Sequence, residues 1–133
     1  MQLQIGIKIF LRNPDGELLF IRRADSPTHD VGYTWDIPGG RVEANEALMQ
    51  ALARELSEEV GFAGTYTPEL IDAQDIFVTT RGLHIVRLTY SADVDKFTPR
   101  LSHEHTEAIW KSKSEMMHDP LLDEITRGTL LKI

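Results

Sequence analysis

The sequence predicts one α/β domain in which strands of antiparallel or mixed pairing pack against helices. Two patterns support this class. Apolar residues alternate with other residues along several short segments, which is the period of a half-buried strand, whereas residues 46–60 repeat apolar residues at helical spacing. Turn-forming residues separate these segments, and the sequence contains no internal repeat or linker. We therefore expect residues 1–133 to form a single domain.

The first half of the chain predicts a β-hairpin, a loop and a short strand. Apolar residues alternate over residues 3–11, and the turn-forming residues 13–16 lead into a second apolar strand at residues 18–23. Residues 24–34 are polar and include a proline and a glycine, which favours a loop. Residues 35–37 are typical of a short strand, and it leads into a pair of glycines.

The second half begins with the predicted helix, which Gly61 ends. The helix buries one apolar face, formed by Leu48, Met49, Leu52, Ala53, Leu56 and Val60. The later elements are a hairpin of strands at residues 70–80 and 83–94, a loop at 96–107, a short strand at 108–110 and an amphipathic helix at 120–131. These elements complete the α/β pattern.

The composition is that of a soluble globular protein, with 41% hydrophobic and 26% charged residues. The sequence has no cysteine, which excludes disulfides and thiolate chemistry, and no apolar stretch of membrane-spanning length. Its first residues alternate instead of forming a basic and then an apolar segment, so we expect no signal peptide and a cytoplasmic location. The net charge of −7 disfavours nucleic acid and membranes as partners, and an anionic ligand would need a cation, such as a metal, to mediate its binding.

Three glutamates are crowded at the end of the predicted helix. Glu55, Glu58 and Glu59 are related by helical spacings of three and four residues, at which like charges repel by a few tenths of a kcal/mol per pair. Each carboxylate near a helix C-terminus also loses about 0.3–1 kcal/mol against the helix dipole. A solvated acidic face is one explanation. The cluster borders the apolar face and its helix follows two glycines, however, which favours a bound divalent cation, because Mg²⁺ prefers oxygen ligands.

The residues around this cluster match a known motif. After Gly40 come five residues, then Glu46, seven further residues and the run from Arg54 to Phe62 that contains the three glutamates. This spacing matches every fixed position of the Nudix box, and the chain resembles Nudix hydrolases. The leading hairpin, the Trp-x-x-Pro-Gly-Gly entry and a late Glu-rich loop before a Trp-ending strand are also similar to this family. The resemblance implies an α/β/α sandwich around a mixed β-sheet.

The resemblance also implies a metal site. Glu55, Glu58 and Glu59 would bind a divalent cation, Mg²⁺ or alternatively Mn²⁺, with Glu58 as the usual central ligand. These three glutamates are therefore candidate catalytic residues. In some members of the family the backbone carbonyl of the glycine equivalent to Gly40 is a further metal ligand.

Two residues are expected to support this site. By the resemblance, Arg54 and Glu46 lie two turns apart on the helix and pair to orient the cluster, and a simple ion pair is compatible with that role. Asn45 stands where many members have glycine. We interpret the change as harmless, because asparagine tolerates a left-handed backbone and is a good N-cap.

The resemblance leaves the general base open, because members of the family draw it from different places. Glu59 is one candidate, and Glu104 and Glu107 in the late loop are others. His103 and His105 flank Glu104. A solvated surface histidine is the alternative to a catalytic role for either of them.

The candidate residues for substrate recognition precede the glycine pair. Arg22 and Arg23 end the second strand and are candidates to hold phosphate, with simple solvation as the alternative. Tyr33 and Trp35 are candidates to stack on a base, although a tryptophan beside a strand also suits the core. The chain has no good match to the proline of many ADP-ribose hydrolases or to the tyrosine of dinucleoside-polyphosphate hydrolases. The default substrate is therefore a nucleoside triphosphate or a nucleotide sugar.

The function implied is that of a Mg²⁺-dependent pyrophosphohydrolase, in which water attacks a bridging diphosphate. The partner is then a small nucleotide, and assembly into a homodimer is left open. One alternative is a catalytically silent Nudix domain that binds a nucleotide as a sensor. The intact glutamate cluster disfavours it, because a pure binder need not keep a full set of metal ligands. A structural acidic domain without a ligand is disfavoured by the match to the box.

Overall fold

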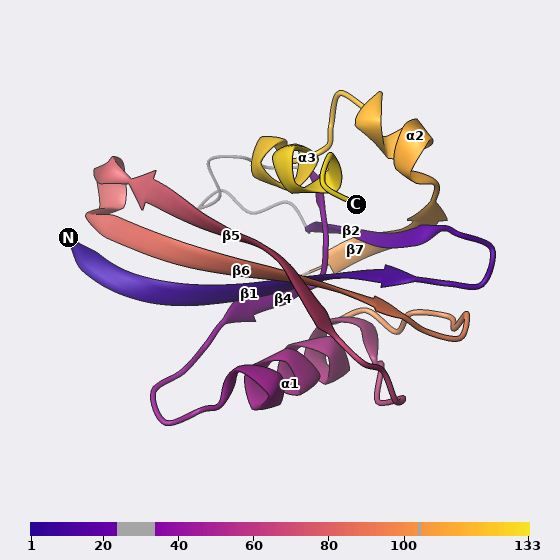
Figure 1. The fold of residues 1–133 in the computed structure, drawn as a ribbon, viewed down its shortest axis with the longest axis horizontal. Helices are drawn as coiled ribbons and strands as arrows, with labels where there is room; N and C mark the ends of the chain where they lie inside the picture. Colours follow the sequence, from indigo (N-terminus) through magenta and orange to yellow (C-terminus); the bar gives the residue numbers. More distant parts are fainter. Residues whose placement is uncertain (24–33, 104) are drawn as a thin grey trace.

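A computed structural model describes residues 1–23, 34–103 and 105–133, which build a twisted sheet with helices on both faces (Figure 1). Helix α1 (Leu48–Val60) covers one face, and α2 (Lys113–Met117) and α3 (Glu124–Leu130) lie over the other. The strands are β1 (Gln2–Arg12), β2 (Leu18–Arg23), β3 (Trp35–Asp36), β4 (Gly39–Arg41), β5 (Glu69–Val78), β6 (Leu83–Asp93) and β7 (His105–Lys111), with a short 3-10 helix, η1 (Thr79–Arg81), between β5 and β6. The predicted α/β/α sandwich is confirmed.

The sheet is mixed, as predicted, and its strand order is β3-β2-β1-β6-β5. β1 and β6 run parallel, from Gln2 opposite Leu83 to Arg12 opposite Asp93, whereas β5 and β6 form the predicted antiparallel hairpin. On its other edge, β1 pairs with β4 through residues 6–8 and with β2 at Arg12. β7 pairs with β2. One edge of β1 is thus divided between two strands, and the sheet splits there.

Alternation along β1 sends its side chains into two cores, one on each face of the sheet. Ile7 and Ile9 are fully buried on the side of α1 and pack in one cluster with Leu52. Phe10 is fully buried on the other side, in a cluster with Met116 of α2. Burial of such side chains stabilises the fold by roughly 1.5–3 kcal/mol each. The first of these cores holds in place the helix that carries the acidic cluster.

Helix α1 begins two residues later than predicted, at Leu48. Asn45 has the positive φ of 65° that asparagine tolerates, but the N-cap is Ala47, so the predicted capping role of Asn45 is wrong. Leu48 and Met49 are 37% and 42% exposed, and Ala53 is also exposed, so these three do not belong to the buried face. The buried residues are Ala51, Leu52, Leu56, Glu59 and Val60. Burial begins only after the first turn, which periodicity alone does not reveal.

Other elements differ from the prediction mainly at their ends. The strand expected at residues 108–110 extends over His105–Lys111, and the closing helix is shorter than 120–131 because its N-cap is Asp123. The sequence pattern did not predict α2 or β4, which are too short for a periodicity to show. Apart from Thr34, the loop predicted at residues 24–34 lies outside the described residues. Among the residues that are described, no helix is long and apolar enough to cross a membrane.

Candidate functional site

The two glycines of β4 bring the backbone against the acidic end of α1. β4 pairs with the middle of β1, with Gly39 opposite Lys8 and Gly40 opposite Ile7. Gly39 has a φ of +145°, and a Cβ atom there would overlap the carbonyl oxygen of Ile7, so the position requires glycine. A Cβ atom on Gly40 would lie 2.5 Å from Oε1 of Glu55. The close approach expected at Gly40 is therefore one between β4 and the Glu55 carboxylate.

The three glutamates differ strongly in exposure. The side chains of Glu55 and Glu59 are 13% and 11% exposed, whereas that of Glu58 is 59% exposed. Together with Ser102 and His103, they line a cavity of about 320 Å³. The glutamates thus lie across the boundary between core and solvent, with Glu59 on the buried face of α1 and Glu58 on its open side.

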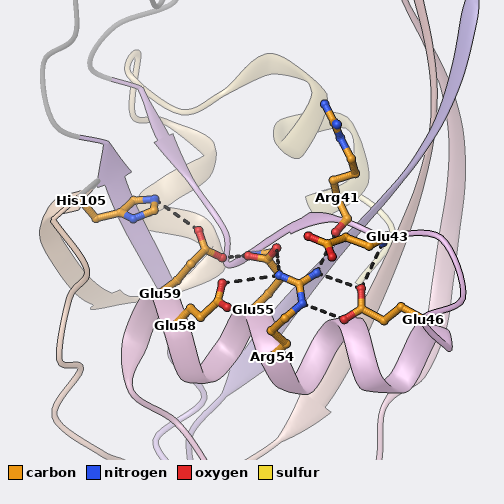
Figure 2. A network of polar contacts seen from close by, with 9 residues as sticks. Arg41, Glu43, Glu46, Arg54, Glu55, Glu58, Glu59 and His105 are labelled. Carbon is orange, nitrogen blue, oxygen red and sulfur yellow. Dashed lines mark hydrogen bonds and ion pairs between the residues drawn. The ribbon is translucent and has the colours of Figure 1, made fainter.

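Arg54 connects these glutamates to the segment before the helix (Figure 2). Its Nε and Nη2 donate to the Glu46 carboxylate at 2.7 and 2.9 Å, and Nη2 also donates to the carbonyl oxygen of Arg41 at 3.0 Å. Nη1 donates to Glu55 at 3.0 Å and to Glu58 at 3.4 Å. The hydrogen bonds between Arg54 and Glu46 lower the pKa of Glu46 to about 2 and raise the pKa of Arg54. The expected pair is present, although Glu46 lies before α1 and not on it.

Glu59 is the buried member of the cluster. The N–H of Gly39 donates to Oε1 of Glu59 at 2.7 Å, and Nε2 of His105 lies 3.4 Å from Oε2. Burial raises the pKa of Glu59 to about 7, although Lys8 and the Gly39 N–H act in the opposite direction, and the charge of Glu55 adds to the rise. A cation in the cavity would favour the ionised carboxylate, so this residue suits a site that binds one.

The donor set suits a hard divalent cation. The carboxylates of Glu55, Glu58 and Glu59 line one cavity and are oxygen ligands of the kind that Mg²⁺ prefers, and Gly40, whose carbonyl the resemblance adds to the ligand set, lies against Glu55. As the side chains lie, however, no three His, Cys, Asp or Glu side chains among the described residues gather closely enough to hold a metal ion. Nη1 of Arg54 donates to two of the three carboxylates. Closing the site around a cation therefore requires a side-chain rearrangement, for which the exposed Glu58 has room.

Known proteins share this fold and this motif. A sequence model of the NUDIX domain family matches residues 2–131. The chain belongs to the Nudix family. It is 33% identical over 108 residues to the CTP pyrophosphohydrolase of Escherichia coli, which is 80% of this chain and 75% of that protein. This membership confirms the predicted family and enzyme class, a Nudix hydrolase acting on pyrophosphate bonds.

Two solved structures extend the similarity to the whole fold. The MutT protein from Methanosarcina mazei Go1 superposes with a TM-score of 0.85 at 25% identity, over 97% of this chain and 91% of that one. The MutT NUDIX hydrolase from Burkholderia pseudomallei gives a TM-score of 0.82 at 27% identity, over 100% and 99% of the two chains. The Nudix fold therefore accounts for the entire arrangement around α1.

Three of the residues predicted to recognise substrate, Arg22, Arg23 and Trp35, lie on strands outside the Nudix box. Trp35 is 7% exposed and belongs to the core cluster with α2 and α3, which favours the core role foreseen as its alternative. The guanidinium carbon of Arg22 lies 5.7 Å from the centre of the Trp35 ring. Nη1 of Arg22 lies 3.4 Å from the carboxylate of Glu107, a predicted base candidate on β7. Arg22 and Glu107 are thus paired with each other across two strands.

The structure describes three of the five remaining predicted residues, one of them by its backbone alone. Tyr33 and Glu104 lie outside the described residues, and Arg23 is described only by its backbone, at the end of β2. His103 lines the glutamate cavity. His105 is buried, so the alternative of a solvated surface histidine is wrong for that residue.

A second cavity, of about 300 Å³, adjoins β4 and was not predicted. Its walls come from β1, β4, β5 and β6 and include the apolar Ile76 and Ile85 and the cationic Lys8, Arg41 and Arg87. Gly40 lines this cavity and leaves no room for a Cβ atom beside Glu55, which lines the glutamate cavity, so the linings of the two cavities are neighbours at β4. A larger hollow of about 550 Å³ beside the turn at Asn13 contains no residue of β4 or of the glutamate cluster.

A polar network joins two cations of the second cavity, Lys8 and Arg87. Lys8 and Arg87 lie 3.3 and 3.5 Å from the carboxylate of Asp36, and the Thr126 hydroxyl accepts from Arg87 and donates to Asp36. Burial alone would raise the pKa of Asp36, but Lys8, Arg87 and the hydroxyl lower it from 3.8 to about 2. Nε of Arg87 is buried without a hydrogen-bond partner in the described part of the chain. Lys8 stands between two apolar residues of the alternating segment 3–11, where a solvated lysine would give the same pattern.

Proposed function

We propose that this Nudix hydrolase is a Mg²⁺-dependent pyrophosphohydrolase, with Mn²⁺ as the alternative cofactor, that cleaves a diphosphate bond of a nucleoside triphosphate. Residues 1–133 would act as one domain whose partner is the small nucleotide. The observation that carries the proposal is a pair of cavities whose linings are neighbours at β4, where Gly40 of one lies against Glu55 of the other. One is lined by carboxylates and the other by apolar and cationic side chains, which are the surfaces that a metal-bound phosphate chain and a nucleoside require.

The glutamate cavity is the proposed place of the diphosphate. When bound there, Mg²⁺ would neutralise charge on the phosphates and lower the pKa of the attacking water. Its proposed ligands are Glu55, Glu58, Glu59 and the carbonyl of Gly40. Arg54 would remain held by Glu46, which it contacts through two nitrogens, and would keep its positive charge beside the carboxylates.

The general base is proposed among the three glutamates named for that role from the sequence. Glu59 lines the glutamate cavity and is a base candidate as well as a ligand candidate. Glu107 is less suited, because its carboxylate is paired with Arg22. Glu104 keeps its place as a candidate from the sequence.

The second cavity is the proposed place of the nucleoside. Ile76 and Ile85 offer apolar surface to a planar base, and Lys8, Arg41 and Arg87 add cationic groups to the wall. Ligand pockets of this kind combine a mostly apolar wall with a few polar groups, and about 300 Å³ is the lower end of their usual volume. The similarity to a CTP pyrophosphohydrolase favours a nucleoside triphosphate over a nucleotide sugar.

The test is to incubate the protein with Mg²⁺ and a panel of nucleoside triphosphates and nucleotide sugars, and then to identify the products. A nucleoside triphosphate should give the monophosphate and pyrophosphate, and EDTA should abolish turnover. Glu58→Gln should lower kcat by about 100-fold or more, since it removes a charged ligand. Glu69→Gln is the matched control, because Glu69 is exposed on β5 and lines neither cavity.

Three outcomes would contradict the proposal. The first is a main activity that releases phosphate from simple phosphomonoesters. The second is Glu58→Gln activity within about threefold of wild type at saturating Mg²⁺, which would remove Glu58 from the metal site. The third is tight binding of a nucleotide without any product, which would identify the silent sensor.

A further inference from the structure

His105 is buried at the start of β7, next to the Glu59 carboxylate (Figure 2). It is 6% exposed, and Glu59 is 8% exposed. Nε2 of His105 lies 3.4 Å from Oε2 of Glu59, and Nδ1 lies 3.3 Å from the hydroxyl oxygen of Ser102. The two ring nitrogens therefore face different groups, a carboxylate that can only accept when ionised and a hydroxyl that can donate or accept.

The Glu59 side chain is held from two directions. The N–H of Gly39 on β4 donates to Oε1 at 2.7 Å, and His105 on β7 approaches Oε2. The backbone is fixed as well, since the N–H of Ser102 donates to the carbonyl oxygen of Glu59 at 3.3 Å. Glu58, by contrast, is exposed and contacts Arg54 at 3.4 Å. The glutamate cavity therefore has one immobilised carboxylate and one that has room to move.

We propose that His105 is a positioning residue that fixes the orientation of the Glu59 carboxylate for binding a divalent cation. The proposal rests on the function proposed above, in which Glu59 is a metal ligand, and in this role His105 contacts neither the cation nor the nucleotide. Groups that hydrogen-bond to a metal ligand orient it, and their removal typically weakens metal binding by about 10–100-fold. The Gly39 N–H would fix one oxygen and His105 would fix the plane of the carboxylate through the other.

Two substitutions distinguish the contact made by Nε2 of His105 from the contact made by Nδ1. Glutamine at position 105 carries its amide nitrogen about as far out as Nε2 and can still donate to Glu59, whereas asparagine reaches only the position of Nδ1, on the side of Ser102. The probe is Mn²⁺ alone, titrated into each protein and followed through the electron paramagnetic resonance signal of the free ion. His105→Asn should raise the Kd for Mn²⁺ about tenfold or more, and His105→Gln should stay within about threefold of wild type.

A matched control is available in His84. Its Nε2 lies 2.8 Å from the carboxylate of Asp75 on the β5–β6 hairpin, so His84→Asn removes a histidine–carboxylate contact that belongs to neither cavity. Mn²⁺ affinity should not change in this variant. Thermal unfolding of all four proteins in EDTA measures the effect of each substitution on the fold independently of metal.

The outcomes separate the two proposals. If wild type binds Mn²⁺ and His105→Asn binds it equally well, the positioning role is overturned while the proposed function stands. An equal loss of affinity in His105→Gln and His105→Asn would indicate a structural role and would also overturn it. If His105→Asn does not fold, His105→Gln still decides, because a tenfold loss in that folded variant contradicts the role and retained affinity supports it. A wild type that binds no Mn²⁺ would overturn the proposed function itself.

Discussion

Replacing Glu58 with glutamine tests whether the acidic end of α1 is adapted to a cation instead of to stability. Glutamine keeps the shape of the side chain and removes its charge. Relief of repulsion with Glu55, three residues earlier, is worth a few tenths of a kcal/mol, and relief of the unfavourable helix dipole about 0.3–1 kcal/mol. The contact with Arg54, at 3.4 Å from a side chain that is 59% exposed, is worth only about 0.3–0.5 kcal/mol. The metal-free variant should therefore be between equal to wild type and about 1 kcal/mol more stable.

Thermal unfolding in EDTA measures the stability of the metal-free proteins, and thermal unfolding in millimolar Mg²⁺ measures how much the cation stabilises each of them. In EDTA the Tm should be unchanged or rise by up to roughly 3 °C. In Mg²⁺ at 100 times the wild-type Kd, wild type should gain about 2.7 kcal/mol, whereas a variant with 100-fold weaker affinity should gain about 0.4 kcal/mol. A variant that is clearly less stable than wild type in EDTA, with an equal response to Mg²⁺, would refute the reasoning. The glutamate cluster would then be structural.

Three other substitutions have definite expectations. Gly39→Ala forces a Cβ atom onto the Ile7 backbone at a φ of +145°, so urea unfolding should show a loss of about 3 kcal/mol or more, and a stable variant would contradict the β4 geometry. In Gly40→Ala the new Cβ atom would meet only the flexible end of the Glu55 side chain, so stability should change by less than about 1 kcal/mol while kcat falls tenfold or more. An unfolded variant or a fully active one would contradict this expectation. Asp36, whose pKa is lowered from 3.8 to about 2, should stabilise the fold by up to about 2 kcal/mol above pH 4, and this contribution should fall to about 0.4 kcal/mol at pH 2. The difference in unfolding free energy between wild type and Asp36→Asn, followed from pH 7 to pH 2, should shrink accordingly, and a constant difference would exclude the linkage.

The glutamate cluster could be predicted because it depends on spacing within one element. Glu55, Glu58 and Glu59 share a short stretch of helix wherever the helix packs, and Gly40 and Glu46 precede it at fixed distances along the chain. The sheet class could be predicted for the same reason, since alternation and turn residues are local signals.

The surroundings of the cluster could not be predicted, because they depend on which strands become neighbours. Lys8, Asp36 and Arg87 come from β1, β3 and β6 and meet only through the strand order and the position of α3. The burial of His105 likewise follows from the pairing of β7 with β2, which brings it to the end of α1. No periodicity within a single segment contains this information.

The division of one edge of β1 between β4 and β2 affects how substrate specificity can change during evolution. β4 takes part of that edge and carries the glycines that contact the glutamates, whereas the opposite edge pairs with β6, and the β5–β6 hairpin supplies Ile76 and Ile85 to the second cavity. β4 and β6 flank β1 on opposite sides. A substitution in the β5–β6 hairpin therefore leaves the hydrogen bonds between β1 and β4 intact. Under the proposed function, specificity can therefore evolve on the hairpin one residue at a time while bond cleavage is inherited unaltered.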